Sequence, residues 1–241
     1  MINKGIFDVI ILCGGKGERL RPYTNSTPKP LTKIKNKEFL QYLIKFFLKN
    51  NFHNIIIACG YKSYLFKKFI KKNYKNEKKI TIVNSGEADI LKRIKDCEIH
   101  VKNNFFVCYG DAFATLNLKK YISFFKKNEK NNFSTIVTSF YKLQFGTLKV
   151  NYRSKKVLNF NEKPKIKEPI NIGYFIFKKD IYKIINKFKI WIGFLKYITK
   201  NRLLKFYNFN GLHLTFNNYG ELQIAKSKMG EIENFLKTKI N

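Results

Sequence analysis

Acidic residues, arginines and long apolar runs are all scarce in this chain of 241 residues. No apolar run approaches the roughly 18 residues that a membrane-spanning helix needs. The first residues lead directly into an apolar segment without the pattern of a secretory signal. We therefore expect a cytoplasmic protein without a membrane partner. Hydrophobic residues make up 44% of the chain, and no proline- or serine-rich linker divides it. This predicts a single domain over residues 1–241.

Cysteines are few, and their spacing matches no metal motif. The four residues Cys13, Cys59, Cys97 and Cys108 are scattered and include no CxxC pair. A disulfide framework or a zinc site is therefore disfavoured. Three of the four lie in or beside strand-like runs, which predicts reduced, buried thiols.

The charge balance is strongly positive, because 48 lysines and arginines face only 16 acidic residues, for a formal net charge of +32. Such a charge suggests nucleic acid, which would give steeply salt-dependent binding to duplex DNA. Only five of the cations are arginine, however, and the lysines are spread over the predicted helix faces. Together with the many Asn, Ile, Phe and Tyr residues, this is typical of A/T-rich coding. We expect no nucleic-acid partner, and a field that attracts small anions.

Strand-like and helix-like segments alternate through the first half of the chain. The predicted strands are Ile6–Cys13, Asn54–Cys59, Lys79–Val83 and Asn104–Tyr109, and the predicted helices are Lys37–Asn51, Tyr61–Tyr74 and Leu118–Asn128. This alternation predicts an α/β fold with a doubly wound, mostly parallel sheet.

The second half is richer in short strands and forms a smaller β-rich extension of that sheet. Strands are predicted at Ser134–Phe140, Gly146–Val150, Lys156–Asn161, Asn171–Phe177, Leu203–Asn208 and Gly211–Phe216. Helices are predicted at Lys179–Lys187, Ile190–Lys200 and Glu221–Lys237.

A glycine-rich, cationic loop follows the first strand, with the sequence LCGGKGERLRPYTNSTPKPL from Leu12 to Leu31. In an open parallel sheet, ligands bind beyond the carboxyl ends of the strands. Glycines let the backbone approach a ligand and turn N–H groups toward phosphate oxygens. Lys16, Arg19 and Lys29 supply countercharge for a triphosphate. The spacings of the Walker and Rossmann phosphate loops are absent. The glycines alone would also suit an ordinary β–α turn.

The whole string GGxGxRLxPxTxxxPKPL resembles the nucleotide-binding loop of the sugar-1-phosphate nucleotidyltransferases. Further similar stretches are Cys59-Gly60-Tyr61-Lys62, Asn84-Ser85-Gly86, Leu91-Lys92-Arg93-Ile94, Tyr109-Gly110-Asp111, Phe145-Gly146, Glu162-Lys163-Pro164 and Asn171-Ile172-Gly173-Tyr174. The first two of these are most similar to glucose-1-phosphate cytidylyltransferases. The resemblance implies a Rossmann-like fold, CTP as the favoured nucleotide and a small phosphorylated acceptor.

The resemblance also implies roles for individual residues. It makes Arg19, Lys29 and Asp111 catalytic. The nucleotide-binding residues would be Leu12, Cys13, Gly14, Gly15, Gly17, Arg19, Gly86 and Gly110. The acceptor-binding residues would be Lys29, Gly146, Glu162, Lys163, Asn171 and Gly173. Residues 1–130 would form the nucleotide-binding half and residues 131–241 the acceptor-binding half. Members of the family are often oligomers, so a homo-oligomer is possible.

Asp111 is the expected Mg²⁺ ligand. It lies just beyond an apolar strand, where a carboxylate can reach a cation at the phosphates. A helix-capping Asp is the alternative for this position, and the resemblance favours the metal. Nucleotidyl transfer needs no protein nucleophile, because the attacking phosphate is already ionised. The isolated residues His53, His100 and His213 are therefore expected to be structural.

Three departures from the family lie on the metal or acceptor side. Asn217 stands where the family has a second metal-binding Asp, with Glu221 nearby, and an amide oxygen ligates Mg²⁺ without adding charge. Ile192-Gly193 follows Trp191 where a sugar-binding Glu is common, and the loop from Gly86 to Leu91 is short. The expected function is transfer of CMP from CTP to a sugar 1-phosphate. A phosphorylated amino acid, phosphocholine or a weakened nucleotide-sugar-binding role are the alternatives.

Overall fold

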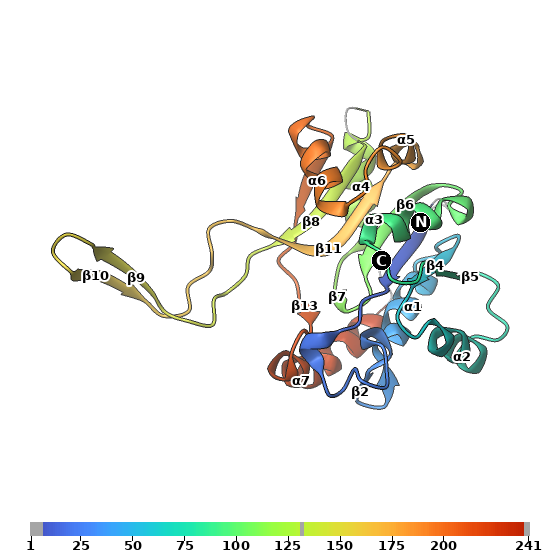
Figure 1. The fold of residues 1–241 in the computed structure, drawn as a ribbon, viewed down its shortest axis with the longest axis horizontal. Helices are drawn as coiled ribbons and strands as arrows, with labels where there is room; N and C mark the ends of the chain where they lie inside the picture. Colours follow the sequence, from blue (N-terminus) through green and yellow to red (C-terminus); the bar gives the residue numbers. More distant parts are fainter. Residues whose placement is uncertain (1–6, 131–132, 239–241) are drawn as a thin grey trace.

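The computed structural model describes residues 7–130 and 133–238. Ile6 of the predicted first strand and the segment ahead of it, where we expect no secretory signal, lie outside these ranges. Seven strands form one mixed sheet in the order β12-β8-β11-β6-β1-β4-β5 (Figure 1). Their bounds are β1 Phe7–Cys13, β4 Ile55–Cys59, β5 Ile80–Asn84, β6 Asn104–Tyr109, β8 Ser134–Ser139, β11 Ile170–Phe177 and β12 Leu204–Asn208.

The sheet is mostly parallel, as predicted. β1 pairs in parallel with β4 and β6, β4 with β5, and β12 with β8, while β11 runs antiparallel to both β6 and β8. β8, β11 and β12 come from the second half of the chain, so both halves contribute to the same sheet.

Helices cover both faces of the sheet, which makes it doubly wound. On one face the apolar core includes residues of α1 (Phe39–Lys49), α2 (Ser63–Asn73), α4 (Leu118–Asn128) and α7 (Tyr219–Lys237). On the other face it includes residues of α3 (Ile90–Asp96), α5 (Tyr182–Ile185) and α6 (Trp191–Lys200). Successive side chains of a strand point to opposite faces. Ile11 of β1 therefore packs in the first core and Ile10 in the second.

Several elements differ from the prediction. α1 begins at Phe39, because Lys37–Glu38 form the short strand β3 that pairs with β2 (Lys33–Ile34). The seven-residue helix α3 was not predicted; Asp89 starts it by accepting a hydrogen bond from the Leu91 N–H at 2.8 Å. A second unpredicted element, β7 (Ala112–Ala114), pairs antiparallel with β13 (His213–Thr215).

The β-rich extension contains an antiparallel ribbon of β9 (Thr147–Asn151) and β10 (Lys156–Asn161) that projects far from the body of the molecule (Figure 1). Every residue of β10 is exposed. The exposed set on and beside the ribbon includes the apolar side chains Phe145, Leu148, Val157, Leu158 and Phe160.

The cysteines are free and buried, as predicted. Burial raises the pKa of the Cys97 thiol to about 12, so that thiol is unreactive at neutral pH. In the parts of the chain that the structure describes, no helix is long and apolar enough to cross a bilayer.

Candidate functional site

The glycine-rich loop leaves β1 at the carboxyl end of the sheet and turns back on itself. Gly17 has a φ of +67°, a left-handed conformation that favours glycine. Its carbonyl oxygen accepts hydrogen bonds from the Thr24 hydroxyl at 2.8 Å and from the Leu20 N–H at 2.9 Å. These bonds tie Gly17 to Thr24 and to the short 3₁₀ turn at Glu18–Leu20, and so fix the path of the loop beyond the strand.

Lys29 brings a buried cation to the centre of the site. It begins the 3₁₀ turn Lys29–Leu31, directly after Pro28. Its ammonium forms an ion pair with the Asp111 carboxylate and donates a hydrogen bond to Asn217 Oδ1 at 2.9 Å. It also lies 5.3 Å from the centre of the Phe216 ring, which favours a cation there.

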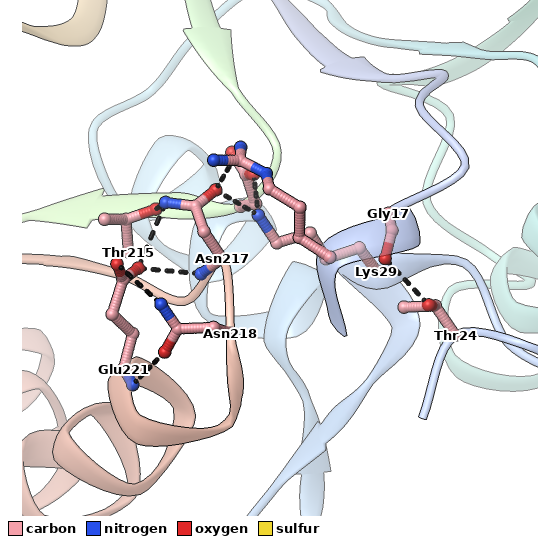
Figure 2. Close-up of polar contacts among 9 residues, drawn as sticks. Gly17, Thr24, Lys29, Thr215, Asn217, Asn218 and Glu221 are labelled. Carbon is pink, nitrogen blue, oxygen red and sulfur yellow. Dashed lines mark hydrogen bonds and ion pairs between the residues drawn. The ribbon is translucent and has the colours of Figure 1, made fainter. Parts of the chain in front are cut away.

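Asn217 joins two cations through one oxygen. Its Oδ1 accepts hydrogen bonds from Lys29 and, at 3.1 Å, from Arg19 Nη2. Figure 2 shows the Lys29 side chain reaching across to Asn217 from the loop that carries Gly17. The antiparallel pairing of β7 with β13 brings Asp111 and Asn217 to the same place beside Lys29, because Asp111 precedes β7 and Asn217 follows β13.

Glu221 determines which way the Asn217 amide points. Its Oε2 accepts hydrogen bonds from Asn217 N at 2.7 Å and from Asn217 Nδ2 at 3.0 Å. The amide nitrogen therefore faces Glu221, and the amide oxygen faces Lys29 and Arg19 (Figure 2). Asn218 caps α7 by accepting a hydrogen bond from Glu221 N at 2.9 Å. Glu221 thus orients Asn217, and it also lines one of the two cavities beside it.

Two cavities meet beside the cluster of Arg19, Asp111 and Asn217. The first, of about 700 Å³, is lined by the glycine-rich loop, Ile90 and Arg93. The second, of about 1050 Å³, is lined mainly by polar and aromatic side chains, including Ser139, Tyr141 and Asn171. Arg19, Tyr109, Asp111 and Asn217 line both cavities. The cavities therefore form one cleft, with the charged groups of Arg19 and Asp111 where they adjoin.

Most of the expected nucleotide-binding residues lie together in the first cavity: Leu12, Cys13, Gly14, Gly15, Gly17 and Arg19. Gly110 packs beneath it, where its N–H donates to the Leu12 carbonyl at 2.9 Å. Gly86 lies just beyond the end of β5, two strands away from β1, and its carbonyl accepts a hydrogen bond from Arg93 Nη2 at 2.8 Å.

The expected acceptor-binding residues are divided between two places. Asn171 lines the second cavity, and Gly173 packs against the Tyr109 ring. Gly146 instead lies just before β9, Glu162 and Lys163 lie just after β10, and none of the three lines either cavity. Lys163 Nζ lies 3.8 Å from Glu162 Oε1, and both side chains are exposed. Because β9 and β10 pair as a separate two-stranded sheet, the projecting ribbon, Gly146, Glu162 and Lys163 at its base lie outside the cleft, and their roles remain predictions.

Arg93 is a site residue for which the sequence analysis predicts no role. Its buried guanidinium donates to three carbonyl oxygens and lines the first cavity. Two observations point to it. It lies in one of the stretches similar to the family, and it is one of only five arginines in a chain whose cations are otherwise lysine.

His213 lines the second cavity but is uncharged at neutral pH. Burial lowers the pKa of its imidazole to about 4, and its Nε2 has no hydrogen-bond partner within the described ranges. His53 lies at the opposite end of β1, where its Nδ1 is 2.9 Å from Asp8 Oδ1.

The central oxygens fit a hard divalent cation. The Asp111 carboxylate and Asn217 Oδ1 converge on the Lys29 ammonium, so they already surround a positive charge. Residues 7–130 and 133–238 contain no cluster of three or more His, Cys, Asp or Glu side chains that could hold a metal. Two protein oxygens suit Mg²⁺, which takes its remaining ligands from phosphates and water.

Comparison with known proteins agrees with this site. The model of the family described as Nucleotidyl transferase matches residues 8–191. Glucose-1-phosphate cytidylyltransferase of Salmonella typhimurium is 29% identical over 202 residues, covering 73% of this chain and 77% of its own. D-glycero-alpha-D-manno-heptose 1-phosphate guanylyltransferase of Campylobacter jejuni is 30% identical over 178 residues, covering 72% and 76%.

Solved structures agree at the level of the fold. The inositol-1-phosphate CTP transferase from T. maritima matches with a TM-score of 0.72 at 18% identity, covering 99% of both chains. HddC from Yersinia pseudotuberculosis complexed with GMP-PN matches with a TM-score of 0.69 at 22% identity, covering 92% of this chain and 99% of its own. The fold is therefore a Rossmann-like α/β fold, and the chain belongs to the Nucleotidyl transferase family.

Proposed function

We propose that this protein transfers CMP from CTP to a small phosphorylated acceptor, a sugar 1-phosphate, and releases pyrophosphate. One observation carries the proposal: two cavities meet at Arg19, Asp111 and Asn217, and the Lys29 ammonium contacts the last two. A reaction between two phosphate groups needs this arrangement, with one compartment for each substrate and positive charge between them. In this proposal the whole chain acts as one domain.

The first cavity suits the triphosphate. The N–H groups of the loop from Gly14 to Gly17 are available to phosphate oxygens, and Lys16 lies at its mouth, 2.6 Å from Glu87. The choice of CTP is supported by the name of the Salmonella relative, a cytidylyltransferase. The Campylobacter relative is a guanylyltransferase, so the base is the part of the proposal most in need of a direct test.

The chemistry is an in-line displacement at phosphorus. An oxygen of the acceptor phosphate forms a bond to the α-phosphorus of CTP, and the bond from that phosphorus to the bridging oxygen breaks. Pyrophosphate leaves with the electron pair. The ammonium of Lys29 and the guanidinium of Arg19 stabilise the negative charge that develops during this exchange. Neither residue has to form a covalent bond.

Mg²⁺ is the proposed cofactor, with Asp111 and the Asn217 amide oxygen as its protein ligands. When bound, it supplies charge neutralisation and orients the phosphates. The Lys29 ammonium contacts both of these residues and lines the first cavity, where it would also contact substrate phosphates.

The test is a pyrophosphate-release assay with each of the four nucleoside triphosphates and a panel of acceptors. The panel contains sugar 1-phosphates, phosphocholine and phosphorylated amino acids. We expect release with CTP and a sugar 1-phosphate, and its loss in Asp111→Asn. Release only with a non-sugar phosphate would correct the acceptor. Nucleotide binding without pyrophosphate release from any pair would favour the alternative, a catalytically weakened protein that binds a nucleotide sugar. The presence of Asn217 where the family has a metal-binding Asp is the reason to consider it.

A further inference from the structure

Arg93 is a buried cation whose three hydrogen bonds all go to backbone carbonyls. Nη1 donates to Cys59 O at 2.6 Å, and Nη2 donates to Gly86 O at 2.8 Å and to Gly14 O at 3.3 Å. The side chain is only 5% exposed. Desolvating a guanidinium is costly, so such a group is retained where its planar fork makes bonds that lysine cannot reproduce.

The three carbonyls belong to the ends of three adjacent strands. Cys59 is the last residue of β4, Gly14 follows the last residue of β1, and Gly86 comes two residues after β5. β1, β4 and β5 are neighbours in the sheet. Arg93 therefore ties the start of the nucleotide loop to the next two strand ends.

The packing around the guanidinium is tight. A Cβ added at Gly14 would overlap the guanidinium, and one added at Gly60 would lie 2.5 Å from Arg93 Nη1 and would also overlap the Gly86 carbonyl. Two glycines at consecutive strand ends thus make room for one side chain. Because Arg93 fills the space between the Gly14 loop and the Gly86 loop and bonds to both, its position sets the distance between these loops.

The proposed function gives this arrangement a consequence. If the triphosphate lies on the loop near Lys29, the nucleoside must occupy the rest of the first cavity. That part is lined by Leu12, Ile90 and Arg93. The loops that Arg93 holds together are therefore the edges between which the ribose and base would lie.

We propose that Arg93 is a positioning residue that fixes the distance between the Gly14 and Gly86 loops and so sets the affinity and base selectivity for the nucleoside triphosphate. This inference rests on the proposed function. Because Arg93 does not contact Lys29 or Asp111, its removal affects nucleotide binding more than the chemical step.

The test compares Arg93→Lys with Ile94→Val. The first keeps the charge but loses the fork. The second weakens the core from the next position of the same helix without touching the loops. In Arg93→Lys we expect KM for CTP to rise by about tenfold or more, with kcat within about threefold, because charge-assisted hydrogen bonds are lost from nucleotide positioning alone. The ratio of kcat/KM between CTP and the other three triphosphates should fall. Ile94→Val should change neither KM for CTP nor the selectivity between triphosphates, even if its melting temperature falls as far as that of Arg93→Lys.

Gly60→Ala provides an independent variant if Arg93→Lys folds poorly. Gly60 does not line the first cavity, yet a Cβ there displaces the same guanidinium. It should raise KM for CTP in the same way. Calorimetric titration with CTP measures affinity without turnover. Wild-type CTP affinity and selectivity in Arg93→Lys, or equal losses in Arg93→Lys and Ile94→Val, would overturn the inference. Absence of turnover in the wild-type protein would instead count against the proposed function.

Discussion

Asn217 controls the charge at the meeting point of the two cavities. Its amide oxygen bonds to both Lys29 and Arg19, and its amide nitrogen bonds to Glu221. A carboxylate in its place would add a negative charge near the cations but would also face the carboxylate of Glu221. The amide and Glu221 therefore work as a pair, and each substitution is best tested together with the other.

The double variant Asn217→Asp, Glu221→Gln should bind the metal more tightly. The introduced carboxylate adds charge, and the introduced amide can donate to it as Asn217 now donates to Glu221. We expect the Mg²⁺ concentration for half-maximal turnover to fall by about tenfold. Mn²⁺ affinity, measured by electron paramagnetic resonance, should rise in parallel.

The single variants provide the controls. Asn217→Asp alone should gain less, because two carboxylates then face each other. Glu221→Gln alone should weaken metal binding, because the Asn217 amide loses the carboxylate that fixes its orientation. Unchanged metal affinity in the double variant would mean that Asn217 is not a ligand.

His213 should make stability depend on pH. Its pKa is about 4 in the folded protein and about 6.5 when unfolded, so the unfolded state binds more protons between these values. The stability is full above the unfolded pKa and is lost as pH falls toward the folded one. Urea denaturation should show a loss of about 2 kcal/mol from this group between pH 7.5 and pH 5. His213→Leu should lose correspondingly less, and an identical loss would contradict the burial argument.

At the scale of elements, a single side chain starts two helices. Asp89 Oδ1 accepts hydrogen bonds from Leu91 N of α3 at 2.8 Å and from Trp191 N of α6 at 2.9 Å. Asp89→Ala should reduce the free energy of unfolding by about 1–2 kcal/mol. Asp89→Asn keeps an acceptor oxygen and should lose less, as urea denaturation can measure. Equal stability of Asp89→Ala and the wild type would show that the two caps contribute little.

The β9–β10 ribbon should be the least protected regular element. An isolated two-stranded ribbon is marginally stable in water, and every residue of β10 is exposed. In hydrogen–deuterium exchange, its amides should exchange rapidly, whereas those of β1, β4 and β6 should be protected. Protection of the ribbon equal to that of the central sheet would show that another surface covers it in solution.

The contrast between predicted and unpredicted elements has a physical basis. β1 and β4 are buried on both faces, so their continuous apolar runs identify them from local composition. α3 has only seven residues, too few for a clear helical period, and its start depends on Asp89. β13 lies inside the predicted strand Gly211–Phe216, whereas the three-residue β7 was not predicted, because it forms by pairing with β13 across a long stretch of chain, which no local pattern reports.

The same reasoning separates the site residues. The glycines and cations around the first cavity form one continuous motif, so the sequence could group them. The orientation of Asn217 by Glu221 and the three carbonyl bonds of Arg93 arise from tertiary contacts. Lys163 is a different case: its motif predicts contact with the acceptor's phosphate, whereas the structure places its exposed side chain beside Glu162 and outside both cavities, so that role stays a prediction.

At the scale of the whole molecule, the net charge of +32 should speed the capture of anionic substrates. Salt screens such attraction, with a Debye length of about 10 Å at 0.1 M ionic strength. We expect kcat/KM for the nucleoside triphosphate to fall severalfold between low and moderate KCl concentrations, while kcat changes little. A kcat/KM that is independent of salt would show that the lysines contribute nothing to substrate capture.

The central claim is that the first cavity holds the triphosphate of an incoming nucleotide with a divalent cation beside Asp111. A crystal structure with a non-hydrolysable CTP analogue and Mg²⁺ tests it most directly. The account predicts phosphate oxygens on the loop from Gly14 to Gly17, a cation bound by Asp111 and Asn217, and Lys29 turned to the phosphates. Nucleotide bound elsewhere, or a cleft that stays empty at saturating ligand, would contradict it.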